Sequence, residues 1–128
     1  MKIEHVALNV PDPVKAAEWY VKHLGMQIIR SSTESPYIHF LADSAGQGVL
    51  EMYSNPAAAV PDYAAQDPLI LHIAFVVEDM AGTRARLLEA GATAAGEITQ
   101  TPNGDQLAML RDPWGVPLQL AKRGKPLL

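Results

Sequence analysis

The sequence predicts an α+β fold made of two βαβββ modules, and three observations support this. The segment HVALNV at residues 5–10 returns as HIAFVV at residues 72–77. In each half, a strand is followed by a capped helix and then by three further strands. Polar side chains also recur at corresponding strand positions in the two halves. One small module, built twice, accounts for all three observations.

The first strand, near residues 3–10, has the period of two that is typical of a half-buried strand. Alternation predicts that one face packs against the core, and its residues are Val6, Leu8 and Val10. His5 lies on the opposite, more polar face. We therefore expect the His5 side chain to point away from the core.

The first helix is predicted over residues 13–24 from signals at both of its ends. Asp12 suits the N-cap, Pro13 suits the first helical position, and Gly25 suits the left-handed residue after the helix. The expected apolar stripe comprises Val14, Ala17, Val21 and Leu24.

Three strands are expected next, near residues 26–32, 37–42 and 48–53. In the last of these, Glu51 lies on the face opposite Leu50 and Met52. His39 alternates with apolar neighbours, so it either shares a face with Glu51 or is a surface or interface histidine. Residues 55–68 contain three prolines and favour neither helix nor strand, which makes them the connection between module one (residues 1–54) and module two (69–123).

The second half repeats the pattern of the first. Strand positions match at a separation of 67, as His5 with His72, and helix positions match at 66, as Gly25 with Gly91. Asp79 caps the second helix, and strands are expected near residues 95–101, 106–111 and 116–121. Gln119 falls on the face opposite Leu118 and Leu120, as Glu51 does in the first half.

Composition narrows the class of protein. A chain of 128 residues is the size of one domain. It has no cysteine, so disulfides, thiolate metal ligands and a cysteine nucleophile are excluded. The net charge of −4 and a short basic segment at residues 122–125 argue against nucleic-acid binding. Without a membrane-spanning run or a signal peptide, we expect a soluble cytoplasmic protein with no membrane partner.

The chain resembles the vicinal oxygen chelate superfamily, which includes glyoxalase I, methylmalonyl-CoA epimerase, extradiol dioxygenases, and fosfomycin and bleomycin resistance proteins. The resemblance covers nearly the whole chain and is carried by HVALNV, WYVKHLGM, GVLEMY, LHIAFVV and RDPWGVPLQL. It implies a cupped eight-stranded mixed sheet, a single glyoxalase-like domain over residues 1–128, and a homodimer. It also implies a divalent metal held at four positions: His5, Glu51, His72 and Gln119.

Gln119 departs from the family pattern, in which the enzymes usually carry a glutamate. An amide oxygen can ligate a cation but cannot abstract a proton. Two imidazoles, one carboxylate and one amide suit Zn²⁺, Ni²⁺, Co²⁺, Fe²⁺ or Mn²⁺ without selecting among them. With Glu51 as the sole anionic ligand, the ion would keep a charge near +1 and favour an anionic, oxygen-bearing substrate. Glu51 is then the candidate base, and a hydroxide on the metal is the alternative.

Three functions follow from these residues. The first is a metal-dependent lyase, isomerase or epimerase of the glyoxalase type that acts on a small oxygenated metabolite. The second is a non-catalytic protein that binds a drug or metabolite, which the glutamine at position 119 favours. The third, an extradiol dioxygenase, is disfavoured because Gln119 breaks the two-histidine, one-carboxylate triad. No feature of the sequence selects a thiol cofactor.

Overall fold

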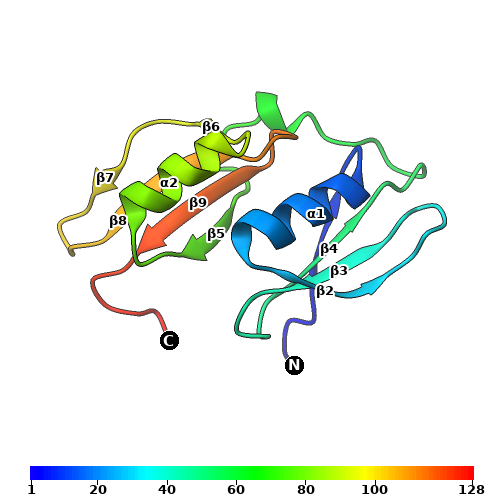
Figure 1. The fold of residues 1–128 in the computed structure, drawn as a ribbon, viewed down its shortest axis with the longest axis horizontal. Coiled ribbons are helices and arrows are strands. Elements are labelled where there is room, and N and C mark those ends of the chain that lie inside the picture. The colour runs from blue at the N-terminus through cyan, green and yellow to red at the C-terminus, as the bar shows by residue number, and fades with distance from the viewer. The chain divides into compact units, whose positions relative to one another are not determined.

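The structure is a computed structural model that describes residues 1–128, and the chain divides into two compact units (Figure 1). Unit 1 spans Met1–Pro61 and unit 2 spans Asp62–Leu128. Each unit contains one α-helix and one mixed sheet. The predicted α+β class and its two modules are confirmed, and the strands of each unit form their own mixed sheet.

Unit 1 has the predicted strand-helix-three-strand order. Its elements are β1 (Val6–Asn9), α1 (Pro13–Leu24), β2 (Gln27–Ser31), β3 (His39–Ala42) and β4 (Val49–Tyr53). The sheet order is β1-β4-β3-β2, with β1 parallel to β4 and the other pairs antiparallel. The first strand therefore lies beside the last, which brings residues about 45 positions apart in the sequence next to each other.

Unit 2 repeats this order with one irregularity. Its elements are the 3₁₀ helix η1 (Tyr63–Ala65), β5 (Ile73–Val76), α2 (Met80–Glu89), β6 (Thr93–Ala94), β7 (Thr99–Gln100), β8 (Gln106–Arg111) and β9 (Pro117–Lys122). The sheet order is β5-β9-β8-β6, and β7 also pairs with β8. The single strand expected near residues 95–101 is instead the two short strands β6 and β7. Gly96, whose φ of 112° no strand allows, lies between them.

The helix boundaries follow from the caps that the sequence predicts. An Asp12 carboxylate oxygen accepts a hydrogen bond from the Lys15 amide at 3.0 Å, and Asp79 accepts one from the Gly82 amide at the same distance. Gly25 ends α1 in the left-handed conformation, with φ 70°. Both helices therefore begin at the expected residues, because capping depends on neighbours in the sequence.

The buried face of α1 differs from the predicted stripe. Val14 and Val21 are 41% and 38% exposed, whereas Ala17 and Tyr20 are fully buried. The helix is thus rotated so that Tyr20, which has no exposed surface, packs on its buried face. Apolar residues occur all around this helix, so its periodicity alone could not select the face.

The pairing registers reveal the duplication in three dimensions. In unit 1 the Cα partner of Ala7 is Glu51, and in unit 2 the partner of Ala74 is Gln119. In both units a histidine lies two residues before this alanine, and the pairing is parallel. The repeat found in the sequence is therefore also a repeat of strand register.

Each sheet packs its helix over a small apolar core. The apolar residues with no exposed surface are Ala17, Tyr20, Leu41 and Met52 in unit 1, and Leu87, Leu110, Leu118 and Leu120 in unit 2. On β4 and β9 they alternate with half-buried residues that include Glu51 and Gln119. Burial of one face leaves the other face of each sheet for polar side chains.

Candidate functional site

His5 and Glu51 come together in unit 1 on adjacent parallel strands. His5 directly precedes β1, and Glu51 lies at the centre of β4. The Nε2 atom of His5 is 3.2 Å from a carboxylate oxygen of Glu51. The side chain of Glu51 is only 14% exposed and that of His5 is 31% exposed, so the pair is partly shielded from solvent.

Two neighbours orient the His5 ring. The Nδ1 atom contacts the Glu4 carboxylate, and the ring meets Phe40 edge-on, with 5.5 Å between centroids and an interplanar angle of 80°. Both ring nitrogens of His5 therefore face a carboxylate oxygen, Nδ1 that of Glu4 and Nε2 that of Glu51. A metal ion shared by Nε2 and Glu51 would require the tautomer with its proton on Nδ1, where Glu4 accepts it, and this is the usual arrangement of metal-binding histidines.

The spacing of this pair fits a shared divalent ion. Metal–nitrogen and metal–oxygen bonds of about 2.1 Å place two ligand atoms roughly 3.0 Å apart at a right angle and roughly 3.4 Å apart at the tetrahedral angle. The observed 3.2 Å lies between these limits. Imidazole and carboxylate are also the ligand types that such ions accept.

In unit 2 the two equivalent residues occupy equivalent strand positions. His72 directly precedes β5, and its Nδ1 donates to the Pro68 carbonyl at 2.9 Å, which leaves Nε2 free. Gln119 lies on β9, the strand that pairs with β5, and is half-buried. The two predicted ligands of unit 2 therefore lie on adjacent strands, as those of unit 1 do.

In unit 1 the structure brings two of the four predicted ligands into contact, and in unit 2 the other two lie at the corresponding positions of paired strands. No cluster of three or more His, Cys, Asp or Glu side chains that could hold a metal is found. A four-residue site requires ligands from both units, and it remains a prediction.

Phe40, not His39, is the β3 residue beside Glu51, because Phe40 is its Cα partner. His39 is 7% exposed on the core face, where its Nδ1 donates to the Tyr37 carbonyl at 2.7 Å. The expectation that His39 either shares the face of Glu51 or lies at the surface is wrong. Both phases of this strand contain apolar residues, so alternation in the sequence could not assign the faces.

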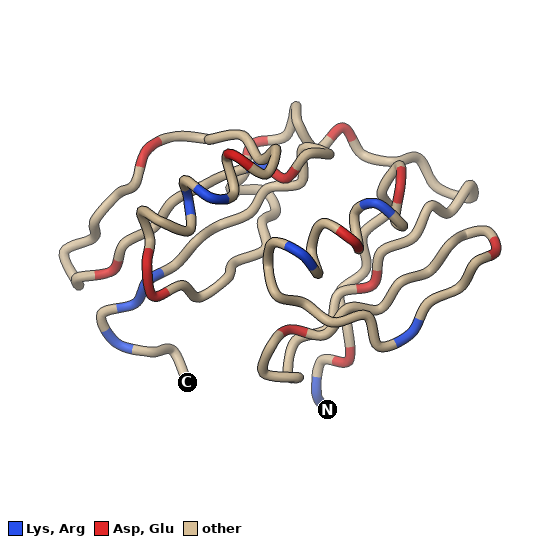
Figure 2. The backbone as a smooth tube through the Cα atoms, in the orientation of Figure 1, with Lys and Arg blue, Asp and Glu red and all other residues tan.

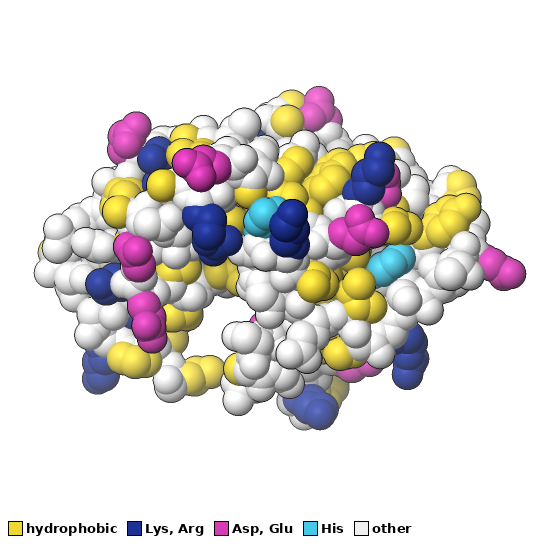
Figure 3. Space-filling model, in the orientation of Figure 1, with side chains coloured by type: hydrophobic (Ala, Val, Ile, Leu, Met, Phe, Trp, Pro, Cys, Tyr) yellow, Lys and Arg dark blue, Asp and Glu magenta, His cyan; other side chains and the backbone are white.

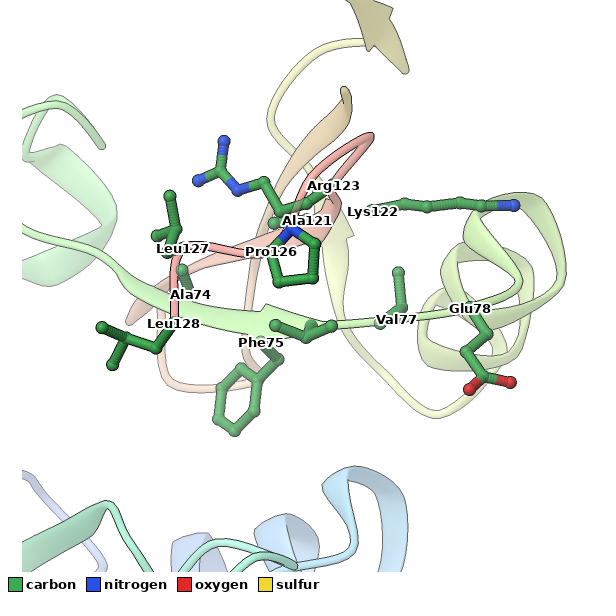
Figure 4. A pocket seen from close by; sticks show the side chains of 11 residues that line it. Ala74, Phe75, Val77, Glu78, Ala121, Lys122, Arg123, Pro126, Leu127 and Leu128 are labelled. Carbon is green, nitrogen blue, oxygen red and sulfur yellow. The ribbon is translucent and has the colours of Figure 1, made fainter. Parts of the chain in front are cut away.

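A cavity of about 700 Å³ in unit 2 lies between β5, the end of β9 and the C-terminal segment (Figure 4). Ala74 lines it, on the same side of β5 as Leu127, but none of the four predicted ligands does. Its lining is mainly apolar. Arg123 also lines it but donates to an Asp105 carboxylate oxygen at 2.7 Å, a hydrogen bond that lowers the pKa of Asp105.

Charged side chains of both signs are scattered over the chain. Figure 2 shows Lys and Arg distributed among Asp and Glu in both units. The face drawn in Figure 3 likewise mixes the two signs with hydrophobic side chains. None of the helices has the length and apolar composition needed to cross a bilayer.

Several known proteins are similar to this chain in sequence or in fold. A "Probable lactoylglutathione lyase" of Vibrio cholerae is 29% identical over 125 residues, which cover 93% of this chain and 88% of that protein. The crystal structure of a glyoxalase family protein from Bacillus cereus matches with a TM-score of 0.80 at 20% identity, covering 96% and 94% of the two chains. The antibiotic binding protein TnmS3 from Streptomyces matches with a TM-score of 0.70 at 25% identity, covering 97% and 99%.

The family model "Glyoxalase/Bleomycin resistance protein/Dioxygenase superfamily" matches residues 2–120, which is nearly the whole chain and both halves of the repeat. The fold of the Bacillus cereus protein agrees with this match. The chain therefore belongs to the glyoxalase/bleomycin resistance protein/dioxygenase superfamily.

Proposed function

We propose that this protein is a metal-dependent enzyme of the lyase, isomerase or epimerase type that acts on a small oxygenated metabolite. The observation that carries the proposal is the His5–Glu51 pair, whose atoms lie 3.2 Å apart. The matching strand positions of His72 and Gln119 in unit 2 support it, as does the likeness to a probable lactoylglutathione lyase.

In the proposed site, His5, Glu51, His72 and Gln119 would hold one divalent ion. When bound, the ion supplies Lewis-acid stabilisation of negative charge on substrate oxygens. Glu51 would take the proton from the carbon beside the substrate carbonyl and return it to the former carbonyl carbon, while the hydroxyl proton passes to the former carbonyl oxygen, so that atoms and charge balance. The oxygen of Glu51 that does not face His5 is the one that we assign to this proton transfer. Gln119 contributes a neutral oxygen and takes no part in it.

Metal binding provides the first test. We expect protein purified without chelator to contain a stoichiometric divalent ion, measured by elemental analysis. His5→Ala and His72→Ala are each expected to weaken the affinity by more than about 100-fold, because second-shell changes alone cost 10- to 100-fold. His23→Ala is the matched control, since His23 lies on α1 against Trp19. Unchanged affinity in both site variants would refute the proposed site.

A second candidate is a non-catalytic binding protein. Gln119 favours it, because an amide occupies a position at which a carboxylate would act as a base. The 25% identity to an antibiotic binding protein also favours it. Such a protein would release its ligand chemically unaltered.

The Gln119→Glu substitution distinguishes the two candidates. A second anionic ligand is expected to raise metal affinity by roughly tenfold. If the scaffold is catalytic, the turnover of lactoylglutathione should rise together with metal affinity. Chromatography of the products measures this turnover. Gln106→Glu on β8 is the control and should change neither quantity. Tighter metal binding without product from either protein would favour the binding function.

A further inference from the structure

A row of side chains crosses the sheet of unit 1 on the face of Glu51. Cα pairing runs from Ala7 on β1 to Glu51 on β4, then to Phe40 on β3 and Arg30 on β2. Directly paired residues point to the same face of a sheet. Arg30 therefore lies on the same face as Glu51, two strands away.

An irregularity in β2 places Arg30 in this row. Ile28 pairs with Leu41, but Arg30, not Ile29, pairs with Phe40, so the register shifts between residues 28 and 30. A bulge of this kind redirects a side chain, and bulges are frequent next to active sites. Without it, Ile29 would occupy the row and Arg30 would point to the opposite face.

The guanidinium group of Arg30 contacts an aromatic ring but no protein oxygen. It lies over the Phe40 ring, 6.0 Å from its centroid, and Phe40 in turn contacts His5. Arg30 is exposed and forms no ion pair or hydrogen bond with the protein. By contrast, Arg84, Arg111 and Arg123 each donate hydrogen bonds to protein oxygens. The five N–H donors of Arg30 are thus free for a ligand.

We propose that Arg30 is a specificity-determining residue that binds an anionic group at the far end of the substrate, through a two-pronged hydrogen bond. This proposal rests on the proposed function, because the near end of the same substrate is held beside His5 and Glu51. Guanidinium matches a carboxylate or phosphate in shape as well as in charge. Its contact with Phe40 limits its motion before the ligand arrives.

The spacing defines the substrate class. Two inter-strand steps put the backbone of Arg30 roughly 10 Å from that of Glu51. In the proposed complex both side chains extend toward the ligand on their common face, and we infer that a gap of a few carbon atoms separates them. The substrate is therefore a small metabolite with two adjacent oxygens at one end and an acidic group about three to five bonds away.

Two hydroxamates that differ only at the far end are the probes. Pentanohydroxamate and glutarate monohydroxamate both present two adjacent oxygens, and only the second has a terminal carboxylate. Their dissociation constants are measured by calorimetry with metal-loaded protein. We expect the wild-type protein to bind the carboxylate probe about tenfold more tightly.

The variants assign this preference to one side chain. Arg30→Gln should remove the preference and leave the affinity for pentanohydroxamate and the metal content unchanged. Arg30→Lys should keep only part of it, because an ammonium cannot form the two-pronged contact. Lys22→Gln, which removes a positive charge from α1, should keep all of it.

The outcomes separate the two proposals. If both probes bind but wild-type and Arg30→Gln proteins show the same preference, Arg30 is not the recognition residue and the proposed function stands. If neither probe binds the metal-loaded protein, the proposed function fails and the role of Arg30 falls with it.

Discussion

The Glu51→Gln variant is expected to lose about 10²- to 10⁴-fold in turnover, the range of a positioned general base. Glutamine keeps the size of the side chain but cannot take a proton. It also removes the only carboxylate among the four proposed ligands, so metal affinity should fall in parallel. Turnover of lactoylglutathione is measured at metal concentrations that saturate each protein, which separates lost chemistry from lost metal.

Two further variants complete this experiment. Glu51→Asp keeps the charge but shortens the side chain. This variant should bind the metal more tightly than Glu51→Gln does, while its turnover should stay below that of the wild type. Glu18→Gln, on an exposed position of α1, is the control and should behave like the wild type. A saturated Glu51→Gln protein with full turnover would assign proton transfer to another group.

The Leu120→Ala variant is expected to lose about 2–5 kcal/mol of unfolding free energy. Leu120 has no exposed surface and lies in β9, where its Cα partners are Phe75 on β5 and Ala108 on β8. Truncation removes buried apolar contacts and leaves a cavity that paired strands on both sides cannot collapse to fill. Chemical denaturation of metal-free protein, followed by circular dichroism, measures the loss.

The matched control is Leu69→Ala, because Leu69 is 80% exposed in the same unit. The unfolding free energy of this variant should stay within about 0.5 kcal/mol of the wild-type value. The same curves test the prediction of a single domain, which requires both units to unfold in one transition. A separate early transition in Leu120→Ala protein would show that unit 2 unfolds on its own.

The helices and the repeat were predictable because their signals are local. Asp12 and Gly25 bound α1 as expected, since caps act on amides and carbonyls within a few residues. The separation of 67 residues correctly matched Ala7 with Ala74, and their partners Glu51 and Gln119 follow from the same order of strands.

The neighbours of Glu51 were not predictable in this way. Phe40 could be assigned to its face only from the antiparallel register of β3 and β4, since both phases of β3 are apolar. Arg30 reaches the same row through a bulge, which shifts the alternation by one residue. No simple pattern in the sequence marks that shift.

The sequence by itself determined the α+β class, the doubled order of elements and both helix starts, because these depend on short-range signals and on the repeat. It also placed His5, Glu51, His72 and Gln119 at corresponding strand positions, and their role as metal ligands, which the family resemblance implies, stays a prediction. Only the tertiary structure decided that Tyr20, and not Val14 or Val21, is buried, and that Phe40 and Arg30 share the face of Glu51. The physical reason is that side-chain orientation in paired strands and on an apolar helix is set by register and packing between distant segments, which local periodicity does not encode.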